Sequence, residues 1–183
     1  MAAASRAPGA AGEASTTALV VIDVQVGQFP TCNEADFLDH VCKLIAKAHA
    51  AKMPVFFIQH NGRKGTELEP CTPGWQLQPS LDIQPGDRVI TKDFIDSFYR
   101  TALLDELRAR KVTRLVLCGL QTDFCVDTAC RHAFSLDFKV VVARDAHSTQ
   151  DSESLKAEQI IAHHARIWDG RFAELKLESE IEF

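Results

Sequence analysis

The chain has 183 residues, of which 46% are hydrophobic and 25% are charged, as in an ordinary globular protein. Its net charge of −5 and the lack of any run of lysines and arginines argue against a nucleic-acid partner. No apolar stretch approaches the roughly 20 residues that cross a bilayer, so we also expect no membrane partner.

Residues 1–15 are rich in Ala, Gly and Ser and have no periodic apolar pattern. We expect a flexible leader over 1–15 and one domain over 16–183. An organellar transit peptide has thin support, because Arg6 is the one basic residue of this stretch. The six cysteines form no C-x-x-C pair, which favours reduced thiols in a cytoplasmic protein over disulfides.

The first half of the chain predicts two strands around a helix. Residues 18–22 form a continuous branched run, typical of a strand buried on both faces. A helix is expected over 36–51 and a strand over 55–58, and residues 61–86 then form a long irregular segment of a kind that is usually functional or disordered. The apolar stripe expected of the helix consists of Phe37, Val41, Leu44, Ile45 and Ala48.

The second half repeats the alternation. Strands are expected over 89–91, 115–117 and 139–143, and a helix over 101–110. Two further helices are expected to open at Cys125 and Ser152. This pattern predicts an α/β fold with a parallel sheet between layers of helices. The apolar residues assigned to the two last helices are Val126, Ala129, Cys130, Ala133, Phe134, Leu155, Ile160 and Ile161.

Three chemically active side chains end or follow separate strands. Asp23 follows the first strand, Lys92 ends the third, and Cys125 follows the fourth after a short polar turn. Taken singly, each also has an ordinary interpretation: Asp23 as a helix cap or turn residue, Lys92 as a solvated surface lysine, and Cys125 as a small packed residue. The carboxyl ends of parallel strands share one edge of the sheet, so together the three side chains can converge on one site.

Such a set has a coherent chemistry. A nearby ammonium lowers the pKa of a thiol, and the first turn of a helix adds to that effect. A carboxylate can accept the thiol proton and later deliver it to a leaving amine. The set therefore predicts a nucleophilic Cys125 with Asp23 as its acid–base partner and Lys92 as the stabilising cation.

The order and spacing of these motifs resemble the isochorismatase-like cysteine hydrolase family, which includes nicotinamidases and N-carbamoylsarcosine amidase. The resemblance covers nearly all of the chain after the leader. The matching segments are residues 21–25, Lys92 with Ser97 and Phe98, residues 119–126, and Asp145-Ala146 with Ser148.

The resemblance implies a single-domain, three-layer α/β/α fold with a six-stranded parallel sheet of Rossmann-like type. It implies a catalytic triad of Asp23, Lys92 and Cys125, and a cis peptide bond between Leu120 and Gln121. The backbone amides of Gln121 and Cys125 would form the oxyanion hole. Because members of the family commonly form oligomers, we also expect a homo-oligomer.

The chain departs from the nicotinamidases near the second strand. Their metal site uses an Asp-x-His pair, whereas His60 has no Asp two residues before it and no histidine after it until His132. A lone histidine does not hold zinc or iron, so we predict no metal and no cofactor. We expect His60 to shape the substrate pocket or cap the strand instead. The other residues expected in the pocket are Phe29, Trp75 and Phe98.

The retained cysteine favours an amidohydrolase that cleaves a C–N bond of a small amide, carbamoyl or lactam compound through a thioester. One alternative is an isochorismatase-type vinyl ether hydrolase. Another is a catalytically silent binding or scaffold protein of the same fold. A redox thiol protein would need Cys118 or Cys130 as a resolving partner. The sequence does not define the substrate.

Overall fold

The computed structural model describes residues 16–183, so the leader expected over 1–15 lies outside the described residues. Within 16–183 the six strands are β1 (Thr16–Ile22), β2 (Val55–His60), β3 (Arg88–Lys92), β4 (Val112–Leu120), β5 (Lys139–Ser148) and β6 (Glu174–Lys176). The helices are α1 (Glu34–Ala50), α2 (Leu103–Ala109), α3 (Asp127–Ser135) and α4 (Ala157–Trp168), with short helical turns at η1 (Val26–Gln28), η2 (Thr122–Val126) and η3 (Glu178–Glu180).

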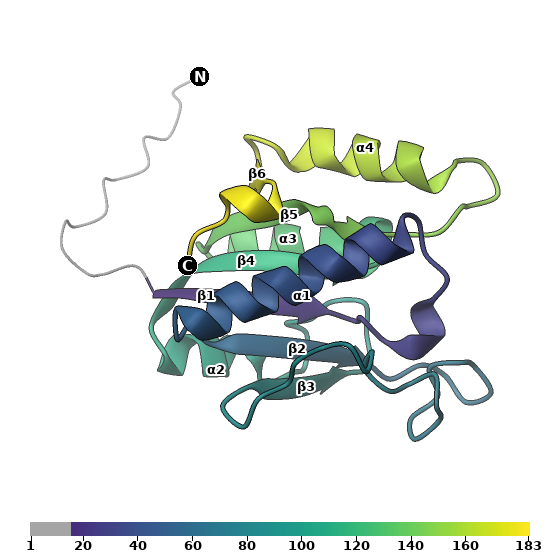
Figure 1. The fold of residues 1–183 in the computed structure, drawn as a ribbon, viewed down its shortest axis with the longest axis horizontal. Helices are drawn as coiled ribbons and strands as arrows, with labels where there is room; N and C mark the ends of the chain where they lie inside the picture. Colours follow the sequence, from purple (N-terminus) through teal and green to yellow (C-terminus); the bar gives the residue numbers. More distant parts are fainter. Residues whose placement is uncertain (1–15) are drawn as a thin grey trace.

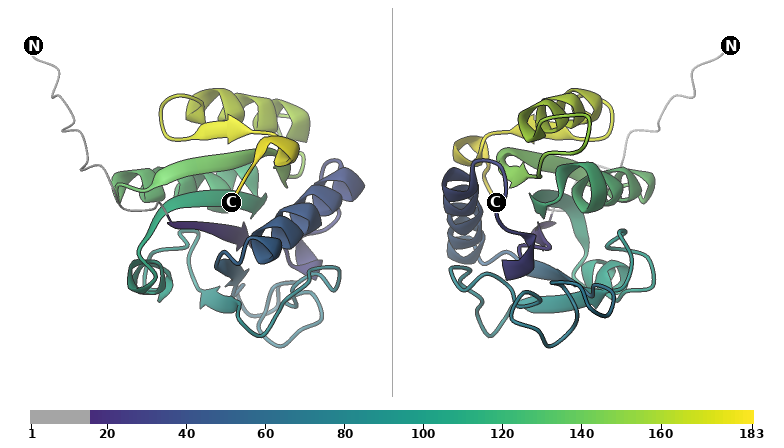
Figure 2. Two further views of the ribbon diagram at one scale, coloured as in Figure 1. Left: turned by 60° about the vertical axis from the view of Figure 1, so that its left-hand side comes forward. Right: turned by 90° about the vertical axis from the view of Figure 1, so that its right-hand side faces the viewer.

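The strands form one parallel sheet in the order β3-β2-β1-β4-β5-β6. Helix α1 covers one face, and α2 and α3 cover the other (Figures 1 and 2). This confirms the expected three-layer α/β/α fold with a six-stranded sheet.

Residues of β1 alternate between the two halves of the core. Ala18, Val20 and Ile22 pack on the side of α2 and α3, whereas Leu19 and Val21 pack on the side of α1. All five are at most 1% exposed, which explains why the strand is apolar at every position rather than at every second one.

Helix α1 forms where its sequence pattern predicts it. Acidic residues lie in its first turn and basic residues in its last, which complements the helix dipole. The buried residues of the helix are those of the expected stripe, Phe37, Val41, Leu44, Ile45 and Ala48.

The order of the strands places a switch point between β1 and β4. From β1 the chain builds outward through β2 and β3, and it then returns to the other side of β1 with β4 and continues outward to β6. In open α/β sheets, ligands bind beyond the carboxyl ends of the strands at such a switch point. Asp23 and the segment leading to Cys125 follow the two strands that flank it.

The end of β4 differs from the sequence prediction. Cys125 does not open a regular helix. It lies in the π-helical turn η2, closed by a hydrogen bond of 3.1 Å from the Val126 amide to the Gln121 carbonyl, and α3 begins at Asp127. Phe134, assigned to the buried face, is 37% exposed and packs edge-on against Phe172.

The last helix begins later than expected. Ser152 forms a separate turn, its hydroxyl accepting a hydrogen bond from the Leu155 amide, and α4 starts at Ala157, whose amide is bound by Asp151. The prediction for Leu155 is therefore wrong, since its side chain is 46% exposed. Among the described helices, none has the length and apolar character that a membrane crossing requires.

Candidate active site

Asp23 follows directly on β1 and is fully buried. Its φ of 51° lies in the left-handed region, where aspartate is tolerated better than most residues. Its amide donates a hydrogen bond of 3.0 Å to the Ile58 carbonyl of β2, which fixes the backbone at this position. The carboxylate therefore lies at the switch point with little freedom to move.

Lys92 reaches Asp23 across the end of a strand. It ends β3, and β2 separates β3 from β1, with His60 as the register partner of Lys92. The Lys92 ammonium lies 2.8 Å from Asp23 Oδ2 and 3.1 Å from Cys125 Sγ. The side chains of Lys92 and Asp23 are both fully buried, so the two charges balance each other in the core.

The segment before Cys125 requires a glycine at the end of β4. Gly119 has a φ of +120°, and a Cβ atom there would lie 2.1 Å from the carbonyl oxygen of Ile22 in β1. The peptide bond between Leu120 and Gln121, next along the chain, is cis. The glycine thus allows the close approach of β4 to β1 that brings Cys125 next to Asp23.

The pKa of Cys125 differs from the expectation. Burial raises the pKa of the thiol to about 12, and the Asp23 carboxylate contributes to the rise, whereas Lys92 opposes it. Lys92 lowers the pKa of Cys125, as expected, but desolvation of the thiol raises it by more. A thiol with a pKa of about 12 keeps its proton near neutral pH.

The cation of the site keeps its charge. Burial alone would lower the pKa of Lys92, but Asp23 and Cys125 outweigh it and the pKa is raised. Buried Cys118 and Cys130 also have raised thiol pKa values. Cys125 is distinguished from them by its direct contact with an ammonium.

His60 lies beside this group as a neutral side chain. Burial, and then the charge of Lys92, lower the pKa of the imidazole. Its Nδ1 atom is buried and has no hydrogen-bond partner in the described part of the chain. His60 can therefore offer an uncharged polar contact to a ligand, and its role in the pocket stays a prediction.

The irregular segment over 61–87 is held to the site by buried amides. The Trp75 carbonyl accepts hydrogen bonds of 2.7 Å from Gln25 Nε2 and 2.9 Å from Gln59 Nε2. The Trp75 indole donates a hydrogen bond of 2.9 Å to Asn61 Oδ1. Both glutamines are at most 5% exposed, so this loop is anchored at the carboxyl edge of the sheet by its tryptophan.

The two phenylalanines expected in the pocket lie on opposite sides of the sheet. Phe98 is 7% exposed and belongs to the core cluster that contains Cys125. Phe29 packs against Phe37 of α1, with ring centroids 6.3 Å apart, on the other core cluster. The contribution of either ring to substrate binding stays a prediction.

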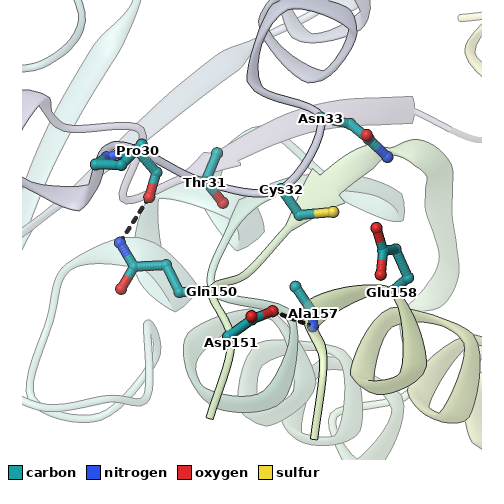
Figure 3. A pocket seen from close by; sticks show the side chains of 8 residues that line it. All are labelled: Pro30, Thr31, Cys32, Asn33, Gln150, Asp151, Ala157 and Glu158. Atoms are coloured by element: carbon teal, nitrogen blue, oxygen red, sulfur yellow. Dashed lines mark hydrogen bonds between the residues drawn. The ribbon is translucent and has the colours of Figure 1, made fainter.

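A hollow of about 550 Å³ is lined by none of the three central residues of the site. It lies between the loop before α1 and the start of α4, and the Cys32 thiol and the Glu158 carboxylate face the same space (Figure 3). Burial, Glu158 and Asp151 raise the pKa of Cys32. This second thiol lacks the lysine contact of Cys125.

Sequence reasoning missed the residues that support the site. Gln25 lies within a motif segment that resembles the family, but the sequence pattern does not predict that Gln25 or Gln59 anchors the loop. The available signal was a glutamine three residues after the end of a buried strand, two residues beyond Asp23. Over residues 16–183, no group of three or more His, Cys, Asp or Glu side chains is placed to hold a metal ion.

The sheet order and the buried cluster of Asp23, Lys92 and Cys125 define an α/β domain that holds an acid, a cation and a thiol at the switch point of its parallel sheet. Residues 17–164 match the isochorismatase domain. The chain belongs to the isochorismatase family.

Two similar proteins of Streptomyces noursei are named streptothricin hydrolase. They are 36% and 34% identical to the chain, over 82% and 90% of its length. The chain spans 62% and 60% of these two proteins, which are therefore considerably longer.

Other relatives match along more of their own length. A ureidoacrylate amidohydrolase of Methylobacterium radiotolerans is 29% identical over 77% of the chain and 70% of that protein. The chain is also similar to the crystal structure of an isochorismatase family protein, with 38% sequence identity and a TM-score of 0.82. The match covers 87% of this chain and 97% of the chain in that crystal structure.

Proposed function

We propose that the protein is a cysteine hydrolase that cleaves a C–N bond of a small amide, carbamoyl or lactam compound through a thioester. The observation that carries this proposal is the position of the Lys92 ammonium, 2.8 Å from Asp23 and 3.1 Å from Cys125. A thiol, a base and a cation in mutual contact at a switch point are the groups that nucleophilic acyl transfer requires.

The first half of the reaction forms the thioester. Cys125 Sγ attacks the carbonyl carbon and its proton passes to Asp23, which is needed because the raised pKa of Cys125 keeps the thiol protonated. The developing oxyanion rests on the backbone amides of Gln121 and Cys125. The C–N bond then breaks, and Asp23 delivers the proton to the departing nitrogen.

The second half restores the enzyme. Asp23 removes a proton from a water molecule, which attacks the thioester carbonyl. The C–S bond breaks, the acid product leaves, and the proton returns to Cys125. Lys92 remains an ammonium throughout and balances the negative charge that moves between the sulfur and the carboxylate.

The relatives support this type of bond. The ureidoacrylate amidohydrolase is named for cleavage of an amide, and the streptothricin hydrolases are also named for hydrolysis. A neutral His60 beside the triad fits an uncharged planar substrate better than an anion, because no charge on the imidazole would attract one. We further propose that the enzyme acts in the cytoplasm as a homo-oligomer without a metal or other cofactor.

A panel of small amides, carbamoyl compounds and lactams tests the proposal on the purified protein. We expect turnover of at least one member, an acyl adduct on Cys125 by mass spectrometry, and loss of both in Cys125→Ala. Cys71→Ala is the matched control, because Cys71 is an exposed free thiol. Turnover that persists in Cys125→Ala would contradict the proposal, and a chorismate-type vinyl ether in the panel tests the alternative chemistry.

A further inference from the structure

The Lys92 ammonium is held by the loop that follows its own strand as well as by its catalytic partners. It donates hydrogen bonds of 3.2 Å to the Phe94 carbonyl and 2.9 Å to the Ile95 carbonyl. With Asp23 and Cys125 these make four acceptors around three N–H donors. The position of the two carbonyls therefore sets where the ammonium lies between carboxylate and thiol.

Phe94 packs edge-on against Tyr99, but burial in the core does not hold this loop. The side chains of Phe94 and Ile95 are 43% and 47% exposed, so the residues that present the two carbonyls are not fixed by burial in the core. The next residue supplies a polar anchor. Asp96 Oδ1 accepts a hydrogen bond of 2.8 Å from the Phe98 amide, which closes the turn after the two carbonyls.

The other oxygen of Asp96 reaches the helix that follows the nucleophile. Asp96 Oδ2 lies 2.7 Å from His132 Nδ1, which must be the donor because a carboxylate can only accept. The His132 ring also packs against the Phe98 ring, with centroids 5.1 Å apart. His132 is part of α3, which continues directly from the turn containing Cys125.

We propose that His132 and Asp96 are positioning residues that fix the distance between the Lys92 ammonium and the Cys125 thiol. Their hydrogen bond links the loop that holds Lys92 to the helix that follows Cys125. Neither residue touches the thiol, so both act through the Phe94 and Ile95 carbonyls.

A different role for the same contact would be general stabilisation. The two side chains are 37% and 22% exposed, and ion pairs of such exposure contribute little to folding. On α3, the neighbouring Arg131 pairs with Asp127 instead and lies over the Phe172 ring. A positioning role therefore predicts an effect on Cys125 that the loss of the Arg131 pair does not produce.

The inference rests on the proposed function, because it assumes that Lys92 tunes Cys125. The test is the rate at which iodoacetamide labels Cys125 at each pH, read by peptide mass spectrometry, which needs no substrate. In His132→Ala we expect labelling at a fixed pH to slow by about threefold to tenfold, as for a weakened hydrogen bond to a charged group. The pH profile should shift upward, in the same direction as in Lys92→Met.

Two further variants separate the causes. His132→Asn retains a donor to Asp96 and should restore the labelling profile, and Arg131→Ala should leave it unchanged. With a substrate in hand, His132→Ala should lower kcat while KM stays nearly constant. If His132→Ala fails to fold, as read by its melting temperature, the same labelling measurement is made on Asp96→Ser, whose hydroxyl can accept from the Phe98 amide but is too short to reach His132.

The outcomes distinguish the two proposals. An unchanged profile in Lys92→Met would overturn the assignment of Lys92 and with it the proposed function. A shift in Lys92→Met with none in His132→Ala would overturn the positioning role alone. A profile shifted in both His132→Ala and His132→Asn would also overturn the positioning role, because the effect would then come from the packing of His132 on Phe98.

Discussion

Thr122 Oγ1 and His147 Nδ1 lie 2.9 Å apart, and this buried hydrogen bond joins the start of η2, the turn that contains Cys125, to the end of β5. Burial, and then the neighbouring His164, lower the pKa of His147 to about 4. The Nε2 atom of the same ring is buried without a hydrogen-bond partner among residues 16–183. Near neutral pH His147 is therefore uncharged, and protonating it would place a charge in the core.

Because the pKa of His147 is lowered in the folded protein, we expect the free energy of unfolding to fall in mild acid. The pKa in the folded state lies below the ordinary value of 6.5, so the unfolded chain binds the proton more readily. The contribution of neutral His147 is complete above about pH 6.5 and declines as the pH falls toward 4. At pH 4.5 the loss should amount to about 2–3 kcal/mol. His147→Asn, which keeps an amide beside Thr122, should not show it.

Urea unfolding at pH 7.5 and at pH 4.5 measures the difference. His163→Asn is the control, because His163 lies exposed on α4 and its substitution should leave the pH dependence of the parent unchanged. If His147→Asn loses as much stability in acid as the parent, the assignment to His147 is wrong.

Gly119→Ala should destabilise the fold strongly. Its Cβ atom would lie 2.1 Å from the Ile22 carbonyl oxygen, at a φ of +120° that side chains rarely adopt. Backbone atoms of two adjacent strands cannot separate without disrupting their pairing, so we expect a loss of about 3 kcal/mol or more. Gly86→Ala is the matched control, because a Cβ there meets no atom within 4 Å. Equal urea midpoints for the two variants would contradict the argument.

The fold followed from the sequence wherever apolar periodicity was strong. The five residues of the α1 stripe are all buried, and the apolar run of β1 is buried on both faces. The pattern failed where the signal was short. Strand β6 has three residues, Glu174–Lys176, and carries no apolar run of its own. Leu155 matched a helical spacing, but the turn at Ser152 ended the pattern before α4 began.

The site was predictable to the extent that it lies at strand ends. Asp23, Lys92 and Cys125 follow separate strands, and parallel topology alone brings them to one edge. The supporting contacts were not predictable, because they join segments far apart in the sequence. Gln25 binds Trp75 across 50 residues, and His132 binds Asp96 across 36. Side chains of these types are usually solvated, and only the folded chain shows their partners.

Gln25→Ala should release the loop that carries Trp75. The Gln25 side chain donates to the carbonyls of His60 and Trp75 and accepts from the His60 amide. Its loss removes these contacts to the His60 backbone and leaves Gln59 as the remaining side-chain donor to the Trp75 carbonyl. We expect a loss of about 2–4 kcal/mol in the free energy of unfolding. Trypsin should also cleave faster after the exposed residues Arg63 and Lys64.

Gln76→Ala is the control for this loop, because the Gln76 residue is exposed and its hydrogen bonds to Val26 and Pro73 are made by its backbone, which the substitution keeps. Parent, control and Gln25→Ala are compared by the rate of the first tryptic cut under native conditions. If Gln25→Ala is cut at the rate of the control, the loop is held by other contacts.

Asp23 and Lys92 act on Cys125 with opposite sign, so their substitutions should shift its reactivity in opposite directions. Asp23 raises the pKa of Cys125 and Lys92 lowers it. Asp23→Asn should therefore move the labelling profile of Cys125 with iodoacetamide to lower pH, and Lys92→Met should move it to higher pH. Turnover should nevertheless fall in both, by about 10²–10⁴-fold in Asp23→Asn if the carboxylate transfers the proton. Faster labelling together with lost turnover would separate the proton-transfer role of Asp23 from its electrostatic effect, and shifts in the same direction for both variants would refute the assignment.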